Sequence, residues 1–91
     1  MKTAVYKYPF QITDEFSIDM PYGSQVLHVA VQNDVPCIWA RVAPGRTMVA
    51  RHFRLAGTGH SLEGAGLHVG TFMQASGALV WHLFDNGEER T

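Results

Sequence analysis

With 91 residues, the chain has room for one domain with a small core. Its hydrophobic fraction of 46% and net charge of -1 exclude a disordered, highly charged chain, and no apolar run reaches the length of a membrane span. Cys37 is the only cysteine, which excludes an internal disulfide and suits a reducing compartment. Because residues 1–10 also lack the apolar run of a secretion signal, we expect a cytoplasmic protein.

Alternation of apolar and polar residues, the period of a half-buried β-strand, dominates the first half of the chain. It predicts strands over Thr3–Tyr8, Phe16–Met20 and Val26–Gln32. The pair Asn33-Asp34 predicts a turn, because both residue types tolerate positive φ angles. The second arm of this hairpin follows over Pro36–Val42, and its proline belongs at the strand's start because proline cannot donate a ladder hydrogen bond.

The second half of the chain continues the pattern. Further strands are predicted over Met48–Leu55, Leu67–Met73 and Ala78–Phe84. A turn at Ala43–Arg46 precedes the first of these, and a turn near Ala75–Gly77 joins the last two. Ser61–Ala65 has room for at most one helical turn, and the polar tail Asp85–Thr91 is expected to fray.

About seven mainly antiparallel strands, at a spacing of roughly 8–12 residues, predict an all-β fold, a small sandwich or barrel with little helix. We expect residues 1–91 to form this single domain. The inward strand positions predict a core of Phe16, Ile18, Leu27, Val29, Val31, Phe53, Leu55, Val69, Leu79 and Leu83.

A candidate ligand site lies where arginines meet glycines. Residues 35–62 carry four arginines and no acid or lysine, and the last two of these arginines stand just before the glycine-rich segment 56–66. Backbone N–H groups of such a turn can point at an anion, and arginine offers planar, bidentate donors for phosphate or carboxylate. The predicted anion site comprises Arg51, Arg54, Gly57, Thr58, Gly59 and His60. The alternative is a flexible loop whose arginines lie on a solvated face.

Strand geometry decides between the two arginines of this site. Arg51 and Arg54 are three residues apart, so their side chains leave a regular strand on opposite faces. We therefore favour Arg54, together with Thr58 and His60, as the anion-binding group. On this hypothesis, replacing Arg46 in the preceding turn weakens binding much less than replacing Arg54.

Trp39 suggests a second kind of site. It alternates with Cys37 and Arg41, opposite in phase to the apolar residues around them, so one face of this strand must be exposed. An exposed tryptophan beside arginine can anchor a protein partner or stack a base, and we name Trp39 and Arg41 as a candidate interaction surface. The alternative is core packing for both Trp39 and Trp81.

Histidine and cysteine give little support for metal or catalytic chemistry. The five histidines are separated by more than four residues each, so neither a metal site nor a cofactor is expected. We expect His28, His52 and His82 on polar strand faces and His60 and His68 in loops. Cys37 lies in an apolar strand, where small buried cysteines are inert. We assign no catalytic residue and expect a binding protein, with an enzyme lacking a recognisable motif as an alternative.

Several short blocks, taken together and in order, resemble a known family. They are Tyr6-Lys7-Tyr8-Pro9, Val29-Ala30-Val31-Gln32-Asn33, Val35-Pro36-Cys37-Ile38-Trp39-Ala40, Gly57-Thr58-Gly59-His60, Val69-Gly70-Thr71-Phe72 and Gly77-Ala78-Leu79-Val80-Trp81-His82. The chain resembles a family of short uncharacterised proteins encoded by phages, prophages and their bacterial hosts. The resemblance implies a small accessory protein that acts inside a bacterial cell, and it carries over no catalytic residue.

Two function classes follow. The first is an interaction or inhibitor module that acts on a host protein, with possible host-defence proteins among its targets. The second is a protein that binds or sequesters a small anion or nucleotide signal through the arginine- and glycine-rich segment. We also expect a homo-oligomer, because exposed sheet edges need cover. Four arginines in a net-negative chain make a modest footprint for nucleic acid, so neither nucleic acid nor a membrane is an expected partner.

Overall fold

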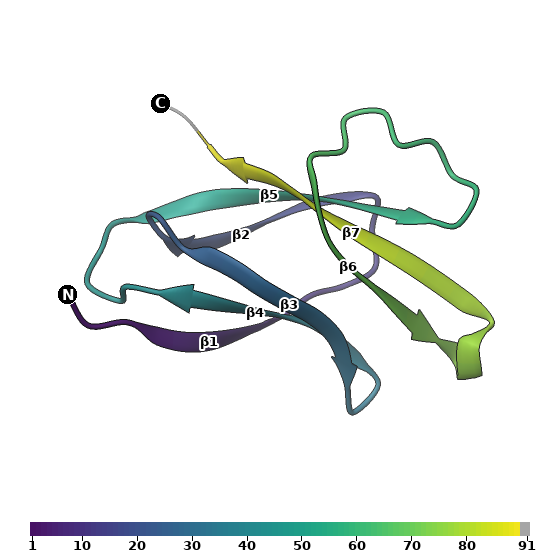
Figure 1. The fold of residues 1–91 in the computed structure, drawn as a ribbon, viewed down its shortest axis with the longest axis horizontal. Helices are drawn as coiled ribbons and strands as arrows, with labels where there is room; N and C mark the ends of the chain where they lie inside the picture. The colour runs from purple at the N-terminus through teal and green to yellow at the C-terminus, as the bar shows by residue number, and fades with distance from the viewer. Residues whose placement is uncertain (90–91) are drawn as a thin grey trace.

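Seven strands make up most of the chain in the computed structural model, which describes residues 1–89 (Figure 1). The strands are β1 (Ala4–Pro9), β2 (Glu15–Pro21), β3 (Gln25–Gln32), β4 (Val35–Val42), β5 (Met48–Gly57), β6 (Leu67–Gln74) and β7 (Leu79–Glu88). The described residues hold one short helical element, the 3₁₀ turn η1 (Ala75–Gly77). The prediction of a small all-β domain with seven strands is confirmed.

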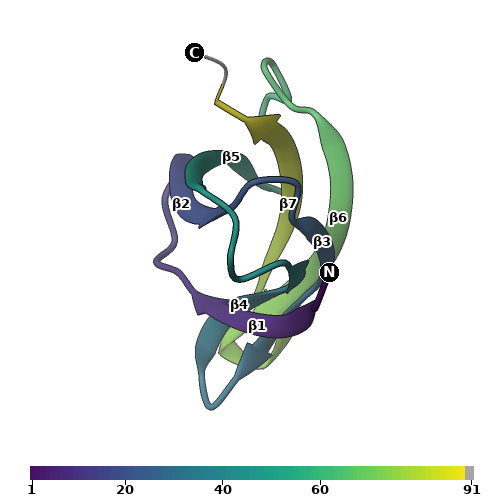
Figure 2. The ribbon, with the colours of Figure 1, turned by 90° about the vertical axis from the view of Figure 1, so that its left-hand side faces the viewer.

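The strands form two sheets whose neighbouring strands are all antiparallel. Sheet A has the order β1-β4-β3, and sheet B has the order β2-β5-β7-β6. Figure 2 shows β3, at an edge of sheet A, beside β6, at an edge of sheet B. A Cβ atom on Gly70 of β6 would lie 2.9 Å from Cγ1 of Val29, so the missing side chain lets these two edges approach.

Inward side chains of the two sheets share one core. Ile38 of β4 and Leu83 of β7 are fully buried, and Phe16 stacks between Phe10 and Phe53 with ring centroids 4.8 and 5.3 Å away. Eight predicted core residues belong to this cluster or pack against it: Phe16, Ile18, Val29, Val31, Phe53, Leu55, Val69 and Leu83. The core also contains Phe10, Met20, Ile38, Ala40, Val42 and Phe72.

Two predicted core residues are exposed instead. Leu27 is 45% exposed because the register of β3 against β4 shifts between Val26 and His28, which leaves Leu27 as the extra residue of a bulge. Val26 takes the inward position and packs against the core. Leu79 is 47% exposed because it opens β7 directly after the η1 turn, at the end of the sheet.

The C-terminal segment is also more ordered than its composition predicts. The prediction that residues 85–91 fray is wrong for residues 85–88, which belong to β7. Residues 90–91 lie outside the described part of the chain. The polar side chains of this segment are engaged by protein groups: the Asp85 carboxylate pairs with Arg51, and the Glu88 carboxylate accepts from the Gly23 amide. The Glu89 amide also donates to the Ala50 carbonyl at 2.8 Å.

The connections follow local residue preferences. Asn33 and Asp34 have φ angles of 51° and 66°, which confirms the predicted hairpin turn. In the long connection between β5 and β6, the Ala65 amide donates to the Leu62 carbonyl and closes a single turn. Figure 1 shows this connection rising away from the sheets before it enters β6. None of the described helical segments is long and apolar enough to cross a membrane.

Candidate functional site

The two sheets differ in charge. The three strands of sheet A contain no aspartate or glutamate, and their lysine and arginine side chains are Lys7 and Arg41. Sheet B carries Glu15, Asp19, Asp85 and Glu88 on its strands. Sheet B also carries Arg51 and Arg54, and Asp34 lies in the turn between β3 and β4, but the strands of sheet A hold positive charges alone and therefore attract an approaching acidic group.

Trp39 lies at the centre of the outer side of sheet A. Its strand neighbours Ile38 and Ala40 are fully buried in the core, so Trp39 points the other way and stays partly exposed. In the register it stands between Lys7 of β1 and His28 of β3. The indole and imidazole centroids of Trp39 and His28 are 6.1 Å apart.

Arg41 lies on the same outer side, two residues further along β4. It is exposed, its cross-strand neighbour Val5 is also exposed, and its Nε donates to the Thr3 hydroxyl at 3.3 Å. We call the outward side chains of Val5, Lys7, His28, Trp39 and Arg41 the Trp39 face. The structure thus brings together the two residues that the sequence named as an interaction surface.

Cys37 shares this phase of β4 but is only 2% exposed. Lys7 Nζ donates to Gln32 Oε1 at 2.8 Å, and in the register this bridge from β1 to β3 crosses the row that contains Cys37. The Cys37 thiol donates a hydrogen bond to the Val35 carbonyl at 3.4 Å. A covered thiol of this kind offers no accessible nucleophile.

The inner side of β1 holds two tyrosines. Tyr6 and Tyr8 have ring centroids 6.5 Å apart. Burial, and then the neighbouring Tyr6, raises the pKa of Tyr8 above its ordinary value of 10.0.

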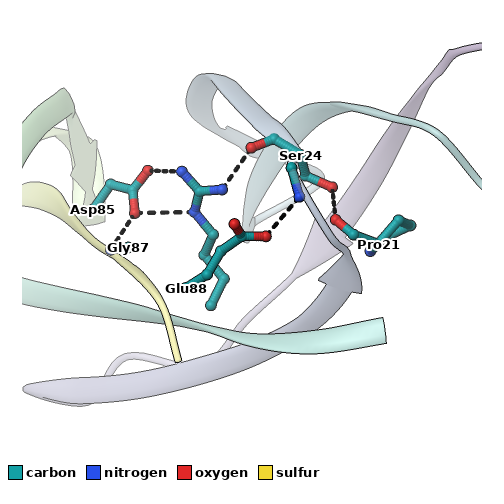
Figure 3. Close-up of polar contacts among 7 residues, drawn as sticks. Pro21, Ser24, Asp85, Gly87 and Glu88 are labelled. Carbon is teal, nitrogen blue, oxygen red and sulfur yellow. Dashed lines mark hydrogen bonds and ion pairs between the residues drawn. The ribbon is translucent and has the colours of Figure 1, made fainter. Parts of the chain in front are cut away.

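Asp85, labelled in Figure 3, forms an ion pair inside the protein with Arg51, a residue of the predicted anion site. The Nε and Nη2 atoms of Arg51 donate to the two carboxylate oxygens of Asp85 at 3.1 and 2.7 Å, and its Nη1 donates to the Ser24 carbonyl. The two side chains are 15% and 11% exposed. This ion pair ties β5 and β7 to the turn between β2 and β3, and it neutralises the guanidinium.

Arg54 is engaged as fully as Arg51, but by carbonyl groups. Its Nη1 donates to the carbonyls of Asp14 and Leu55 at 3.0 and 2.7 Å, and its Nη2 donates to the Ser61 carbonyl at 3.1 Å. The side chain therefore joins the segment before β2 to the loop after β5. These contacts occupy donors that a bound anion would need.

The loop residues of the predicted site bond to one another or to β7. The Gly57 amide donates to His60 Nδ1 at 3.2 Å, Gly59 has a φ angle of 89° in the same turn, and the His60 ring meets Trp81 edge-on. Thr58 Oγ1 lies 2.9 Å from His82 Nε2. Among the described residues, no hydrogen bond joins Arg54 to Thr58 or to His60, and each of the three side chains is held by other protein groups.

The comparison with known families matches the whole span. A family model described as a domain of unknown function, DUF7352, matches residues 1–91. The chain belongs to the DUF7352 family. Neither the curated proteins nor the solved structures contain a match. The family description names no ligand, so the binding chemistry of this DUF7352 protein rests on its own side chains.

One row of hydrogen-bonded side chains in the DUF7352 protein was not predicted from the sequence. Thr71 Oγ1 lies 2.9 Å from His82 Nδ1 and 3.3 Å from His68 Nε2, which extends the contact between His82 and Thr58 across β7 and β6. His68 was expected in a loop but lies in β6. The hydroxyl groups of Thr58 and Thr71 can each donate or accept a hydrogen bond, so this row of side chains fits either tautomer of His82. The register that aligns these residues has no sequence signal.

Across residues 1–89 of the DUF7352 protein, no three His, Cys, Asp or Glu residues cluster as metal ligands would.

Proposed function

We propose that this DUF7352 protein is a small accessory binding protein whose Trp39 face docks on an acidic surface of a host protein. The observation that carries the proposal is a partly exposed tryptophan at the centre of a sheet that has no acidic residue. Tryptophan and arginine are the side chains most often found at the energetic centre of protein interfaces. Here Trp39 supplies the apolar anchor, while Lys7 and Arg41 complement an acidic partner.

The state of the other arginines supports this choice of face. Arg51 is neutralised by Asp85, and Arg54 is bonded to backbone carbonyls, so neither is available without breaking internal contacts. Arg41 has one bond, from Nε, among the described residues and keeps its terminal nitrogens for a partner. The phage or prophage context implied by the sequence resemblance makes a bacterial protein the proposed target, with the DUF7352 protein acting as its inhibitor.

The experiment is affinity capture from bacterial lysate with matched bait proteins. The baits are the wild-type protein, Trp39→Ala, and a control, Met73→Ala, which removes a 60% exposed apolar side chain from sheet B. Some proteins should be captured specifically by both the wild type and the control. The captured amount of these proteins should fall by roughly tenfold or more with Trp39→Ala, the effect of losing an interface anchor. Capture should also weaken as salt is raised, because the attraction between the charges is screened.

Circular dichroism checks that both variants keep the wild-type fold. An identical set of captured proteins for wild type and Trp39→Ala, with losses confined to Met73→Ala, would place the interface on sheet B and contradict the proposal.

A further inference from the structure

Two open hollows adjoin at one end of the molecule, where the turn between β2 and β3 meets the turn between β4 and β5. The Tyr22 amide donates to the Thr47 carbonyl at 2.8 Å and joins the two turns. The larger hollow has a volume of ≈ 480 Å³ and the smaller ≈ 260 Å³, and Tyr22 and Arg46 line both.

Arg46 reaches into this region from the turn before β5. Its backbone amide closes the turn by donating to the Ala43 carbonyl at 3.0 Å. Its guanidinium carbon lies 5.6 Å from the centroid of the Tyr22 ring, within the range of a cation–π contact. Nη1 lies 3.1 Å from the position that a Cβ on Gly23 would take, so the glycine leaves room for the guanidinium. The aromatic contact orients the side chain without neutralising its charge.

Arg41 is the second cation of the smaller hollow. Its Nε is held by the Thr3 hydroxyl, and within residues 1–89 no carboxylate oxygen lies within 4.0 Å of Arg41 or Arg46. The lining of both hollows contains no aspartate or glutamate. One acidic side chain contacts a residue that lines the smaller hollow: Glu88 Oε2 accepts a hydrogen bond from the Gly23 amide at 2.7 Å. Two guanidinium groups thus line one hollow without an anionic partner.

We propose that the two adjoining hollows together, which we call the Tyr22–Arg46 site, bind a small phosphorylated ligand that also carries a planar group, a molecule of the nucleotide class. Paired guanidinium groups provide bidentate donors that match the oxygens of a phosphate. The exposed ring of Tyr22, on the border of both hollows, offers a face on which a base can stack. The side chains of Gln25 and Thr3 line the smaller hollow and add hydrogen-bonding groups.

The Tyr22–Arg46 site differs from the anion site predicted from the sequence. The prediction centred on Arg54 and expected Arg46 to matter little. In the structure, Arg54 has three carbonyl acceptors, whereas the Arg46 guanidinium has only the Tyr22 ring among the described residues. The structure therefore leads to the opposite order of importance for the two arginines.

The test is isothermal titration of the protein with ADP, adenosine and pyrophosphate. We expect saturable binding of ADP, weaker binding of pyrophosphate, and none of adenosine, because the phosphates supply the charge. Arg46→Ala and Arg41→Ala should each weaken ADP binding by roughly tenfold to a hundredfold, the effect of losing a charge-assisted hydrogen bond. The matched control Arg54→Ala should leave ADP affinity within about twofold, which is under ~0.5 kcal/mol.

A second variant tests the aromatic contribution. Tyr22→Leu should reduce the affinity for ADP to that for pyrophosphate, while Tyr22→Phe, which keeps the ring, should retain it. Absence of saturable ADP binding at millimolar concentration, equal binding of adenosine and ADP, or equal losses in Arg46→Ala and Arg54→Ala would each overturn the proposal. The outcome is separable from that of the protein capture, because Trp39→Ala should leave ADP binding intact.

Discussion

The four arginines between residues 41 and 54 illustrate how one residue type takes different roles in one small fold. Arg51 pairs with a carboxylate, Arg54 binds carbonyl groups, and Arg41 and Arg46 keep guanidinium donors without an acidic partner. The sequence shows the local excess of positive charge and predicts opposite faces for Arg51 and Arg54. It does not reveal Asp85 as the partner of Arg51, because the two residues are 34 positions apart and meet only through the pairing of β5 with β7.

Arg51→Met should destabilise the fold, because Arg51 joins β5 and β7 to the turn between β2 and β3. The substitution removes both guanidinium donors from the largely buried Asp85 carboxylate, which keeps the Gly87 amide, and it removes the Arg51 donor of the Ser24 carbonyl, so the free energy of unfolding should fall by about 3 kcal/mol. Urea denaturation followed by circular dichroism measures this loss. The control Arg46→Met, at an exposed guanidinium, should stay within about 0.5 kcal/mol of wild type. Equal midpoints for wild type and Arg51→Met would show that the ion pair contributes nothing to stability.

At the scale of elements, alternation predicts the strands because one face of each strand packs against the core. It fails where the pairing is irregular: the bulge at Leu27 turns this residue outward while Val29 and Val31 keep the expected inward phase. It also fails at the polar residues 85–88, which are ordered by bonds between strands. The phase of β4 predicts that Trp39 and Ile38 lie on opposite sides of the strand, but which side is exposed becomes clear only in the structure, where Ile38 is buried and Trp39 is partly exposed. The Tyr22–Arg46 site is not predictable, because two distant turns form it.

Gly70 should be essential to the contact between β3 and β6. A methyl group there would lie 2.9 Å from the buried Val29 side chain, whose β-branched shape leaves it little freedom to move. Gly70→Ala should therefore lower the free energy of unfolding by about 1–3 kcal/mol, the usual cost of overpacking. Thermal and urea denaturation provide the measurement.

Gly45→Ala is the matched control, since a Cβ there meets nothing within 4 Å and should change stability little. The double variant Gly70→Ala/Val29→Ala should lose less than the sum of its two single variants, because removing the valine methyls relieves the overlap. Stability of Gly70→Ala equal to that of Gly45→Ala would show that β3 and β6 do not approach as described.

At the scale of the whole molecule, the two sheets separate the charges, with an acid-free sheet A opposite a sheet B that carries acids and engaged arginines. The broad face proposed for a protein partner and the small site at one end of the molecule share one residue, Arg41. The predicted homo-oligomer stays a prediction: β1 and β2 each lie at a sheet edge, and a second copy could pair with either strand.

The central claim, that sheet A is the interaction face, is tested most directly by hydroxyl-radical footprinting of the protein alone and in complex with its captured partner. Oxidation of Trp39 should fall in the complex, while Met48 and Met73, exposed residues of sheet B, should oxidise at unchanged rates. Protection of Met48 or Met73 with Trp39 oxidation unchanged would contradict the account.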